Sequence, residues 1–346
     1  MDIFAYLGVD IHPHQQTVAW VEKGKVRTRP FHHSDKKAIE EFYRRFPAGS
    51  IVGYEAGGHY YWFEQLLFEI GLEVKIGNAR TIRKAAVSPH KSDKRDAMHI
   101  LDLLMTGRFP EVWRRSLKSR QILSWLNQRD SLVKQRTAVS NQLQAQARAA
   151  GLDRFRMKQK DAQERVVTAD LVDEYLVKSR FRILNTLNLE IAEISRLLHL
   201  KTQGDEMVAR LLTHSGIGDL TALCLVHTLG DVTRFARKEQ VTAFVGLVPT
   251  NESSGDKHRI GKITKNGSRL LRFLLGQAGQ STTDQKLRDF YGQVSRRRGA
   301  AKAKVAVARK LLERCYIMMR DSIDYEEYRR RGEVGLPEKH RKQSDS

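Results

Sequence analysis

Apolar positions in the first third of the chain fall into short strand-like runs and helical periods. Three strand-like runs come first, at 3–11, 17–24 and 25–31, and the last two are joined at Lys23-Gly24, which is typical of an antiparallel meander. Helices are then expected at 36–46, 59–71 and 93–107, and strands at 50–56 and 72–79. The pattern predicts a mixed α/β domain in the order βββαβαβα.

The middle of the chain carries a heptad-like apolar pattern. Trp125, Leu132 and Val139 recur at intervals of seven. After Gly151, steps of three and four connect Leu184, Leu187, Ile191, Ile194 and Leu198. Two readings stay open, a helical hairpin within one chain and a coiled coil that joins two chains, and either would separate the two ends of the protein.

The last part is predominantly helical, and its first helical patterns are interrupted by Gly216 and Gly218 in the run SGIG. A glycine turn before a helix can present backbone N–H groups to a phosphate, as in the helix-hairpin-helix element of DNA-binding proteins. A plain connection between helices would also use glycine. Farther on, 295–315 reads as one helix whose lysines and arginines lie along a phosphate backbone or form a solvated basic face.

Charge and composition narrow the class of partner. Lys and Arg outnumber Asp and Glu by 61 to 40 in 346 residues, a net charge of +21, which favours a nucleic acid. Neither a basic amphipathic helix nor a lipid signal opens the chain, and Asp2 and Asp10 argue against a signal peptide, so we expect a cytoplasmic protein without membrane attachment. Cys224 and Cys315 lie in apolar helical contexts and are expected to be reduced core residues.

Four acidic residues fall where a metal-dependent enzyme would need them. The predicted order is that of a ribonuclease-H-like domain, in which Asp10 and Glu55 would end two strands at one sheet edge. Asp93 and Asp96 are three residues apart on one helical face, whereas Asp102 is turned away and is left out. Oxygen ligands without a His or Cys cluster suit Mg²⁺ or Mn²⁺. Taken singly, Asp10 could cap a turn and Asp93 could cap a helix.

Taken together, these features resemble a known family along nearly the full chain. The matching runs are GVDI with Asp10, YEAGG with Glu55, KSDKRDA with Asp93 and Asp96, SGIG, and GLVPTNESSG with Ser254. In this combination they resemble the insertion-sequence transposases with a RuvC-like DEDD domain and a serine-containing domain, a group that includes Piv-type DNA invertases and bridge-RNA-guided recombinases. One departure is Gly57-Gly58 after Glu55, where many relatives have Thr-Gly.

The resemblance assigns roles to residues. It implies a catalytic set of Asp10, Glu55, Asp93, Asp96 and Ser254, in which the acids bind Mg²⁺ or Mn²⁺ and Ser254 attacks a DNA phosphodiester, with Ser253 only its neighbour. The alternative is that the serines are turn residues in a basic loop. The positions expected to contact nucleic acid are Gly216, Gly218, Lys257, His258, Arg259, Lys262, Lys265, Arg269, Arg298, Lys302 and Lys304.

Partners follow from the same resemblance. It implies donor and target DNA, a structured guide RNA, and a dimer or a tetramer made of two dimers, in a prokaryotic, nucleoid-associated protein. The expected domains are a RuvC-like α/β domain at 1–115, a coiled-coil spacer at 116–204, a mainly α serine-containing domain at 205–330, and a polar tail at 331–346. Two rivals stay open: a RuvC-like nuclease that uses water, and a non-catalytic nucleic-acid-binding protein.

Overall fold

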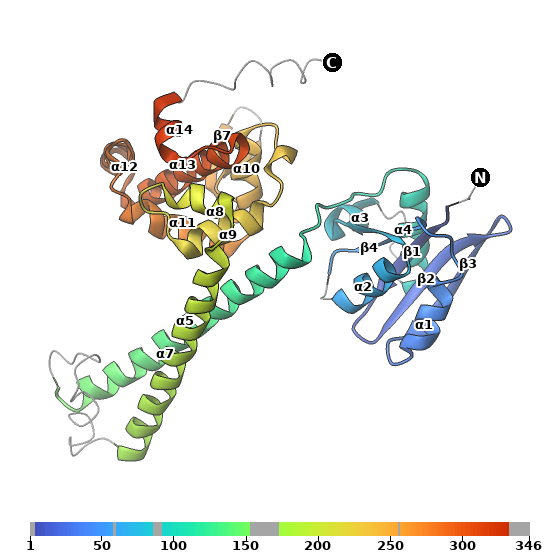
Figure 1. The fold of residues 1–346 in the computed structure, drawn as a ribbon, viewed down its shortest axis with the longest axis horizontal. Helices are drawn as coiled ribbons and strands as arrows, with labels where there is room; N and C mark the ends of the chain where they lie inside the picture. The colour runs from blue at the N-terminus through green and yellow to red at the C-terminus, as the bar shows by residue number, and fades with distance from the viewer. Residues whose placement is uncertain (1–3, 58–59, 86–91, 153–172, 255–256, 332–346) are drawn as a thin grey trace. The chain divides into compact units, whose positions relative to one another are not determined.

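The chain divides into two compact units, Met1–Arg114 and Arg115–Ser346 (Figure 1). The computed structural model describes every residue except 1–3, 58–59, 86–91, 153–172, 255–256 and 332–346, and the side chains of 251–260 are outside the description as well. The expected polar tail therefore lies outside the described residues apart from Arg331. The separation of a helical spacer from a serine-containing domain stays a prediction within the second unit.

The first unit contains a five-stranded sheet with the strand order β3-β2-β1-β4-β5. Its strands are β1 (Tyr6–Ile11), β2 (Gln15–Glu22), β3 (Lys25–His32), β4 (Ile51–Glu55) and β5 (Glu73–Gly77). The first three pair antiparallel, which confirms the predicted meander. From β1 the sheet continues through β4 and β5 in parallel, so β1 and β4 end at the same edge.

Four helices accompany this sheet among the described residues of the first unit. They are α1 (Lys36–Tyr43), α2 (Tyr61–Glu69), α3 (Ala79–Ala85) and α4 (Asp93–Met105). The predicted order of strands and helices is confirmed, with α3 as an addition that the sequence pattern did not predict. The short helix follows Asn78, whose side-chain oxygen accepts hydrogen bonds from the backbone N–H groups of Arg80 and Thr81.

Alternation along β1 gives the two faces of the sheet different neighbours. Leu7 and Val9 are fully buried in a core that includes Phe42 of α1 and Phe63 of α2. Gly8 points to the opposite face, where a side-chain Cβ would lie 2.3 Å from the backbone nitrogen of Leu101 in α4. Because side chains alternate along a strand, Asp10 shares the α4 face with Gly8.

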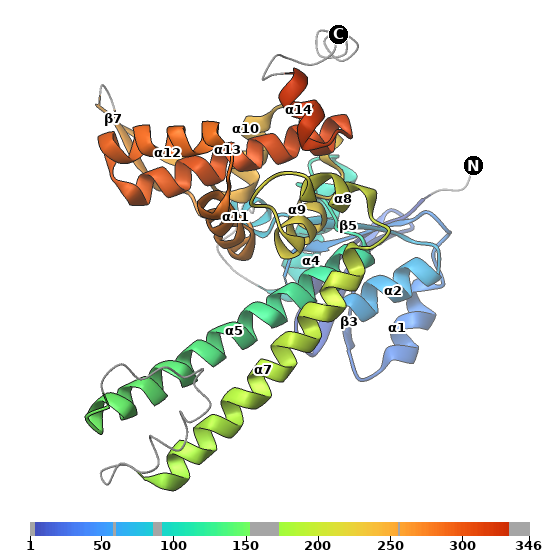
Figure 2. The ribbon, with the colours of Figure 1, turned by 60° about the vertical axis from the view of Figure 1, so that its left-hand side comes forward.

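The second unit begins with two long helices, α5 (Leu117–Ala149) and α7 (Glu174–Thr202), which lie side by side (Figure 2). The predicted seam positions Leu184, Leu187, Ile191 and Leu198 are buried, while Ile194 is partly buried. The structure thus has a helical pair within one chain, and dimerisation through it stays a prediction. The end of the pair far from the rest of the unit has its own small core, which includes Leu143, Ala147, Val177, Phe181 and Leu184.

In the part that the structure describes, the rest of the second unit is helical apart from one hairpin. Its elements are α8 (Glu206–Leu212), α9 (Asp219–Leu229), the 3-10 helix η1 (Val232–Arg234), α10 (Lys238–Val245), β6 (Pro249–Ser254), β7 (Lys257–Ile263), α11 (Arg269–Ser281), α12 (Gln285–Arg298), α13 (Ala300–Asp321) and α14 (Tyr325–Arg331). Cys224 and Cys315 are free and buried, as predicted. Burial raises the pKa of each thiol to about 12.

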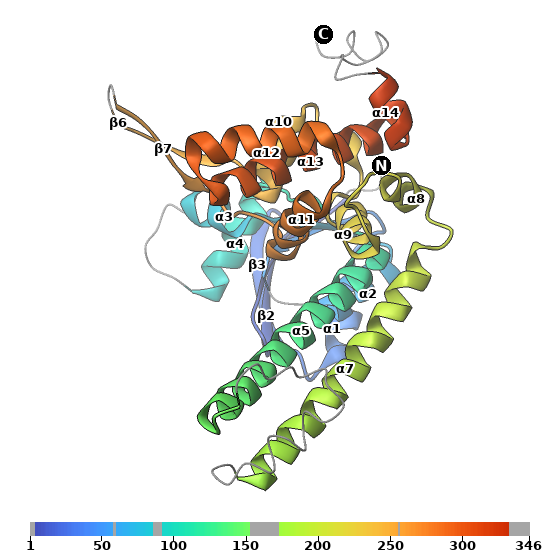
Figure 3. The same cartoon turned by 90° about the vertical axis from the view of Figure 1, so that its left-hand side faces the viewer.

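The helix expected at 295–315 is two helices, so that prediction is wrong in one respect. Gly299 has a φ of 85° and ends α12, and α13 begins at the next residue. Glycine adopts this backbone conformation more easily than other residues, so it reverses the chain here. The helices α12 and α13 pack side by side (Figure 3). None of the helices in the described ranges combines the length and the apolar character needed to cross a membrane.

Candidate metal centre and serine hairpin

Asp10 and Glu55 lie at neighbouring strand ends. In the parallel pair of β1 and β4, Val9 is opposite Tyr54, so Asp10 and Glu55 are the next residues along the two strands. Tyr54 is buried in the core on the α1 and α2 side, which places Glu55 on the α4 face together with Asp10. The convergence predicted for these two strand ends is therefore found in the backbone.

Asp93 and Asp96 occupy the first turn of α4. The N-cap of this helix is Ser92, whose hydroxyl accepts a hydrogen bond from the N–H of Arg95, so the reading of Asp93 as the cap residue is wrong. A cap residue upstream leaves the Asp93 carboxylate available to other partners. Asp102 lies outside this site and forms an ion pair with Arg108 at 3.3 Å.

His12 joins the acidic residues, although the sequence reasoning missed it. Its Nε2 atom lies 3.1 Å from Oδ2 of Asp10 and 3.3 Å from Oδ1 of Asp93. One ligand atom from each of these three residues lies within 4.8 Å of the others. The available signal was the spacing of two, because His12 follows Asp10 by two positions directly after the end of β1.

The local electrostatics suit a cation. Burial raises the pKa of Asp10; His12 opposes this shift, and the nearby charges of Asp96 and Asp93 add to it. Oδ2 of Asp10 and Nε2 of His12 are buried atoms 3.1 Å apart, and neither makes a hydrogen bond of good geometry. A divalent ion would satisfy both atoms and offset the repulsion between the carboxylates, so the residues present fit such an ion.

Glu55 and Asp96 lie outside the cluster of Asp10, His12 and Asp93. Oε1 of Glu55 accepts a hydrogen bond from Nη2 of Arg83 in α3 at 2.8 Å. Asp96 acts on Asp10 through its charge but is not one of the three residues whose ligand atoms lie within 4.8 Å. Of the four predicted acids, Asp10 and Asp93 are therefore the two that share this three-residue cluster with His12.

Ser254 ends a β-strand. The stretch read as a basic loop is a hairpin, so that expectation is corrected: β6 and β7 pair antiparallel, and Ser254 is opposite Lys257. Ser253 is opposite His258, and Glu252 is opposite Arg259. The backbone register therefore sets both serines opposite predicted nucleic-acid contacts.

The base of the hairpin is held by close backbone contacts. Gly246 has a φ of 78°, and a Cβ there would lie 2.2 Å from the carbonyl oxygen of Asn266. Nη1 of Arg272 donates to the carbonyl oxygens of Val245, at 2.8 Å, and Asn266, at 2.6 Å. Arg272 is a positioning residue that sequence reasoning missed, because its partners are backbone atoms.

The remaining basic positions are spread over several elements. Outside the hairpin strands, Lys265 and Arg269 are exposed, as is Lys262 at the end of β7. Arg298 ends α12, whereas Lys302 and Lys304 are exposed on α13. The side chains of Lys257, His258 and Arg259 lie outside the described residues. Contact of these residues with nucleic acid stays a prediction.

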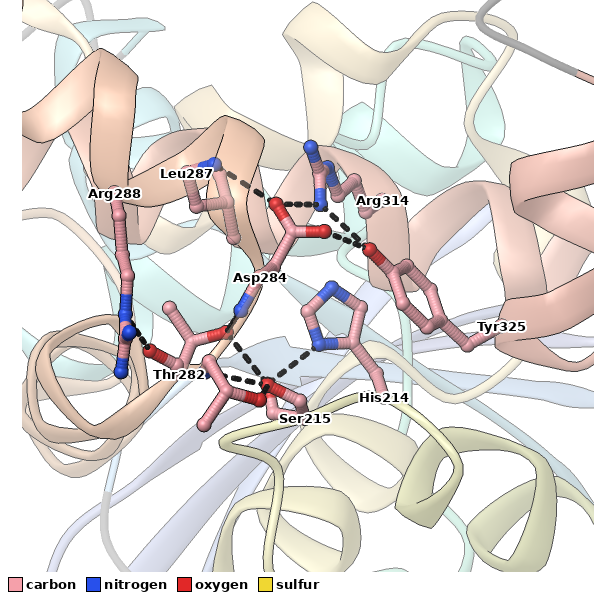
Figure 4. A network of polar contacts seen from close by, with 9 residues as sticks. His214, Ser215, Thr282, Asp284, Leu287, Arg288, Arg314 and Tyr325 are labelled. Atoms are coloured by element: carbon pink, nitrogen blue, oxygen red, sulfur yellow. Dashed lines mark hydrogen bonds and ion pairs between the residues drawn. The ribbon is translucent and has the colours of Figure 1, made fainter.

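The SGIG run forms the loop between α8 and α9. Gly216 has a φ of 90°, and a Cβ there would lie 2.5 Å from the carbonyl oxygen of Ala278 in α11. Gly218 is the N-cap of α9 and has open space around it. The hydroxyl of Thr282 donates to the carbonyl oxygen of Ser215 at 2.9 Å (Figure 4). Gly216 is thus required for packing, and phosphate binding by the loop stays a prediction.

A buried polar network adjoins this loop (Figure 4). Asp284 accepts a hydrogen bond from the N–H of Leu287 at 2.8 Å, contacts Nη1 of Arg314 at 3.1 Å and accepts a hydrogen bond from the Tyr325 hydroxyl. Burial alone would raise the pKa of Asp284, but these contacts outweigh it and hold the pKa below its ordinary value. The ring of His214 lies 4.1 Å from that of Tyr325, and burial lowers the pKa of His214. The network links the loop to α12, α13 and α14.

Two family models match the chain. The model described as the transposase IS116/IS110/IS902 family matches residues 208–292. A second model, for the DEDD transposase of IS110 elements, matches residues 7–150. The second range contains Asp10, Glu55, Asp93 and Asp96, and the first contains Ser254.

Individual relatives agree with these matches. The chain is 30% identical over 237 residues to the transposase for insertion sequence element IS1328 of Yersinia enterocolitica. The aligned region covers 66% of this chain and 70% of the relative. It is 28% identical over 276 residues to the transposase for insertion sequence element IS1111A of Coxiella burnetii, and the aligned region covers 76% of this chain and 75% of that relative. A probable family 20 transposase of Pseudomonas aeruginosa is 27% identical over 323 residues, and the aligned region covers 89% of this chain and 91% of that relative.

Proposed function

Because the chain belongs to the IS116/IS110/IS902 family of transposases, we propose that it cuts and rejoins DNA through a covalent bond to Ser254. Family membership makes it a transposase that acts in DNA transposition. The observation that supports a metal-assisted cutting step is the convergence of Asp10, His12 and Asp93 in the part matched by the DEDD model. The serine hairpin lies in the part matched by the other model.

We assign the first unit to the ribonuclease-H-like class. Its strand order, with three antiparallel strands followed by two parallel ones, supports this assignment. Asp10 and Glu55 at adjacent strand ends, with Asp93 and Asp96 on the helix that covers that face, would hold Mg²⁺ or Mn²⁺. A bound ion would polarise the phosphate and stabilise negative charge on the attacking and leaving oxygens.

Ser254 would act as the nucleophile. Its hydroxyl oxygen attacks the phosphorus of a DNA phosphodiester, so that an Oγ–P bond forms as one P–O bond to a deoxyribose breaks. The leaving deoxyribose oxygen takes up a proton, and the serine proton passes to a base or to solvent. A second DNA hydroxyl then attacks the phosphorus of the phosphoserine, so that a P–O bond to its deoxyribose forms as the Oγ–P bond breaks. The proton of that hydroxyl passes to a base or to solvent, Ser254 takes up a proton, and the strands are rejoined. The paired strand with Lys257, His258 and Arg259 would hold the DNA backbone and offset charge.

The partners that we propose follow from the net charge and the resemblance. A charge of +21 suits binding to donor and target DNA and to a structured guide RNA that would select both sites by base pairing. A dimer, or a tetramer made of two dimers, would bring the metal centre and the serine hairpin to the same DNA strand. The helical pair of α5 and α7 is the element that we propose for this assembly.

A denaturing gel tests the serine step. The full chain is expressed with its native flanking DNA and Mg²⁺, and the gel is probed for a protein–DNA adduct. We expect an adduct for the wild type and for Ser253→Ala, and none for Ser254→Ala or Asp10→Asn. DNA cleavage by Ser254→Ala without any adduct would favour a nuclease that uses water. Unchanged function in both Ser254→Ala and Asp10→Asn would favour a non-catalytic nucleic-acid-binding protein.

A further inference from the structure

We propose that His12 supplies a nitrogen ligand to the ion held by Asp10 and Asp93, so that this centre prefers Mn²⁺ to Mg²⁺. The inference rests on the proposed function, since it concerns the same metal centre. It adds a ligand outside the acidic set that the sequence predicted, and it gives the centre a preference between ions.

The spacing of the three side chains is that of ligands around one ion. Two ligands about 2.1 Å from an octahedral ion and at right angles to each other lie about 3.0 Å apart. Nε2 of His12 lies 3.1 Å from Oδ2 of Asp10 and 3.3 Å from Oδ1 of Asp93. These distances match neighbouring positions of one coordination shell.

The contact between His12 and Asp10 leaves both atoms unsatisfied. Nε2 of His12 and Oδ2 of Asp10 are buried and lie 3.1 Å apart, yet neither makes a hydrogen bond of good geometry. An imidazole that served only to bind the carboxylate would be expected to donate a well-aligned hydrogen bond, because a buried polar atom without a partner is costly. An ion between the two side chains would satisfy both.

Neighbouring contacts hold these ligands in place. The backbone N–H of His12 donates to the carbonyl oxygen of Gln15 at 2.8 Å, which fixes the turn between β1 and β2. Nε2 of Gln15 donates to Oδ2 of Asp93 at 2.9 Å and leaves Oδ1 toward His12. Second contacts of this kind orient metal ligands and reduce the cost of ordering them on binding.

A nitrogen ligand changes which ion is favoured. Mg²⁺ prefers carboxylate, carbonyl and water oxygens, whereas imidazole nitrogen binds transition-metal ions more strongly. Adding one imidazole to an acidic centre therefore raises the affinity for Mn²⁺ more than that for Mg²⁺. Removing His12 should weaken Mn²⁺ binding more than Mg²⁺ binding without removing the site.

Spectroscopy of the bound ion tests the inference directly. Mn²⁺ is added to the full chain, and electron spin echo envelope modulation is recorded for coupling to a directly bound ¹⁴N nucleus. We expect this coupling in the wild type and its loss in His12→Asn. Calorimetric titration should show a Kd for Mn²⁺ that rises about tenfold in His12→Asn, with the Kd for Mg²⁺ changed by less than about threefold.

Two variants serve as matched controls. His14→Asn removes an exposed histidine from the same turn, and Gln15→Ala removes a contact to Asp93 without removing a nitrogen ligand. Both should keep the ¹⁴N coupling. A coupling that persists in His12→Asn, or Mn²⁺ binding without any ¹⁴N coupling in the wild type, would overturn the inference.

The outcome is separable from that of the proposed function. Asp10→Asn should abolish binding of both ions if the acidic centre holds metal, whatever His12 does. Loss of binding in Asp10→Asn together with wild-type affinities in His12→Asn would reject the nitrogen ligand and keep the acidic centre. If the wild type binds neither ion, the inference and the metal role in the proposed function both fail, while the serine adduct is still tested separately on the gel.

Discussion

Asp10 places a carboxylate where its charge is poorly solvated. Its side chain is 13% exposed, and Asp93 and Asp96 both act on it with like charge. Burial and repulsion of this kind destabilise a folded protein unless a cation offsets them. Residues selected for metal binding therefore reduce the stability of the metal-free protein at this point.

This conflict predicts the behaviour of Asp10→Asn. The amide keeps the size of the side chain but removes its charge, so the melting temperature at pH 7.5 with EDTA should rise by about 1–3 °C. Added Mn²⁺ should raise the melting temperature of the wild type, because the ion binds only the folded state, and leave that of the variant unchanged.

Scanning calorimetry with and without Mn²⁺ measures both effects. Asp102→Asn is the matched control, since this exposed acid pairs with Arg108 outside the centre, and it should respond to Mn²⁺ like the wild type. A variant Asp10→Asn that melts lower than the wild type in EDTA, or that still gains stability from Mn²⁺, contradicts the prediction.

A second prediction separates two glycines of the same loop. Gly216→Ala must adopt a φ of 90° and bring its Cβ within 2.5 Å of the Ala278 carbonyl oxygen, so we expect a loss of about 2–4 kcal/mol in the free energy of unfolding. Gly218 has a φ of −107° and open space around it, so Gly218→Ala should cost under about 1 kcal/mol. Urea unfolding of the two variants gives the comparison, and equal stabilities would show that the close approach is not made.

Residue identities were predictable where a periodic pattern fixed a face. The predicted strand ends placed Asp10 and Glu55 at one edge of the sheet, and the helix period placed Asp93 and Asp96 on one face. His12 was missed because its spacing of two relates it only to Asp10, whereas Asp93 is 81 positions away and only the fold brings it to His12. Arg272 was missed because it binds backbone carbonyl groups, which leave no trace in a sequence.

At the scale of elements, the two long helices owe their pairing to an apolar seam. Leu143 and Val177 are fully buried at the far end of the pair, while Phe181 and Leu184 are nearly so. This core is small and separate from the main core of the unit, so the far end depends on few side chains. A single deletion there should loosen the end of the pair without unfolding the rest.

Leu143→Ala tests this dependence. Removing a buried leucine costs about 2–4 kcal/mol, so amide hydrogen exchange should quicken in residues 139–149 and 177–184 while the helices α9 and α13 keep their protection. Leu189→Ala is the control, because Leu189 is 72% exposed on the same pair. Exchange that quickens equally throughout the unit would mean that the far end does not open independently.

Elements with a clear period were predicted, and those with conflicting signals were not. The meander and the seam of α7 have regular apolar spacing. The strands β6 and β7 have polar and basic residues at most positions, so the sequence pattern indicated a loop where the structure has a hairpin. The helical pattern continues across Gly299 into the next helix, and only the backbone reversal at a φ of 85° separates them.

At the scale of the whole molecule, the proposed catalytic groups belong to different units. Asp10 lies in Met1–Arg114 and Ser254 in Arg115–Ser346, and each unit has its own hydrophobic core. A substitution in one unit should therefore leave the other folded and able to contribute its residues. Whether a site draws both units from one chain or from two can be decided by mixing variants.

Mixing Asp10→Asn chains with Ser254→Ala chains tests whether one site uses both units of one chain or units of two chains. Each variant alone should give no adduct and no recombination. If each site combines the metal centre of one subunit with the hairpin of another, about half of randomly mixed dimers contain both variants, and one of their two sites is intact. Such mixing should restore recombination to about a quarter of the wild-type level at most, because half of the sites in half of the dimers carry both functional groups.

The control places both substitutions in one chain, mixed with a chain that carries either one alone. Dimers of that mixture have no intact site in any arrangement, since the shared substitution is present in every subunit, so they should stay inactive. Failure of the complementary mixture to recover activity, with heterodimers demonstrated by differently tagged subunits, would mean that Asp10 and Ser254 act within one chain. Recovery would instead require the two units of different subunits to meet at one DNA strand, and the assembly would then control when cutting occurs.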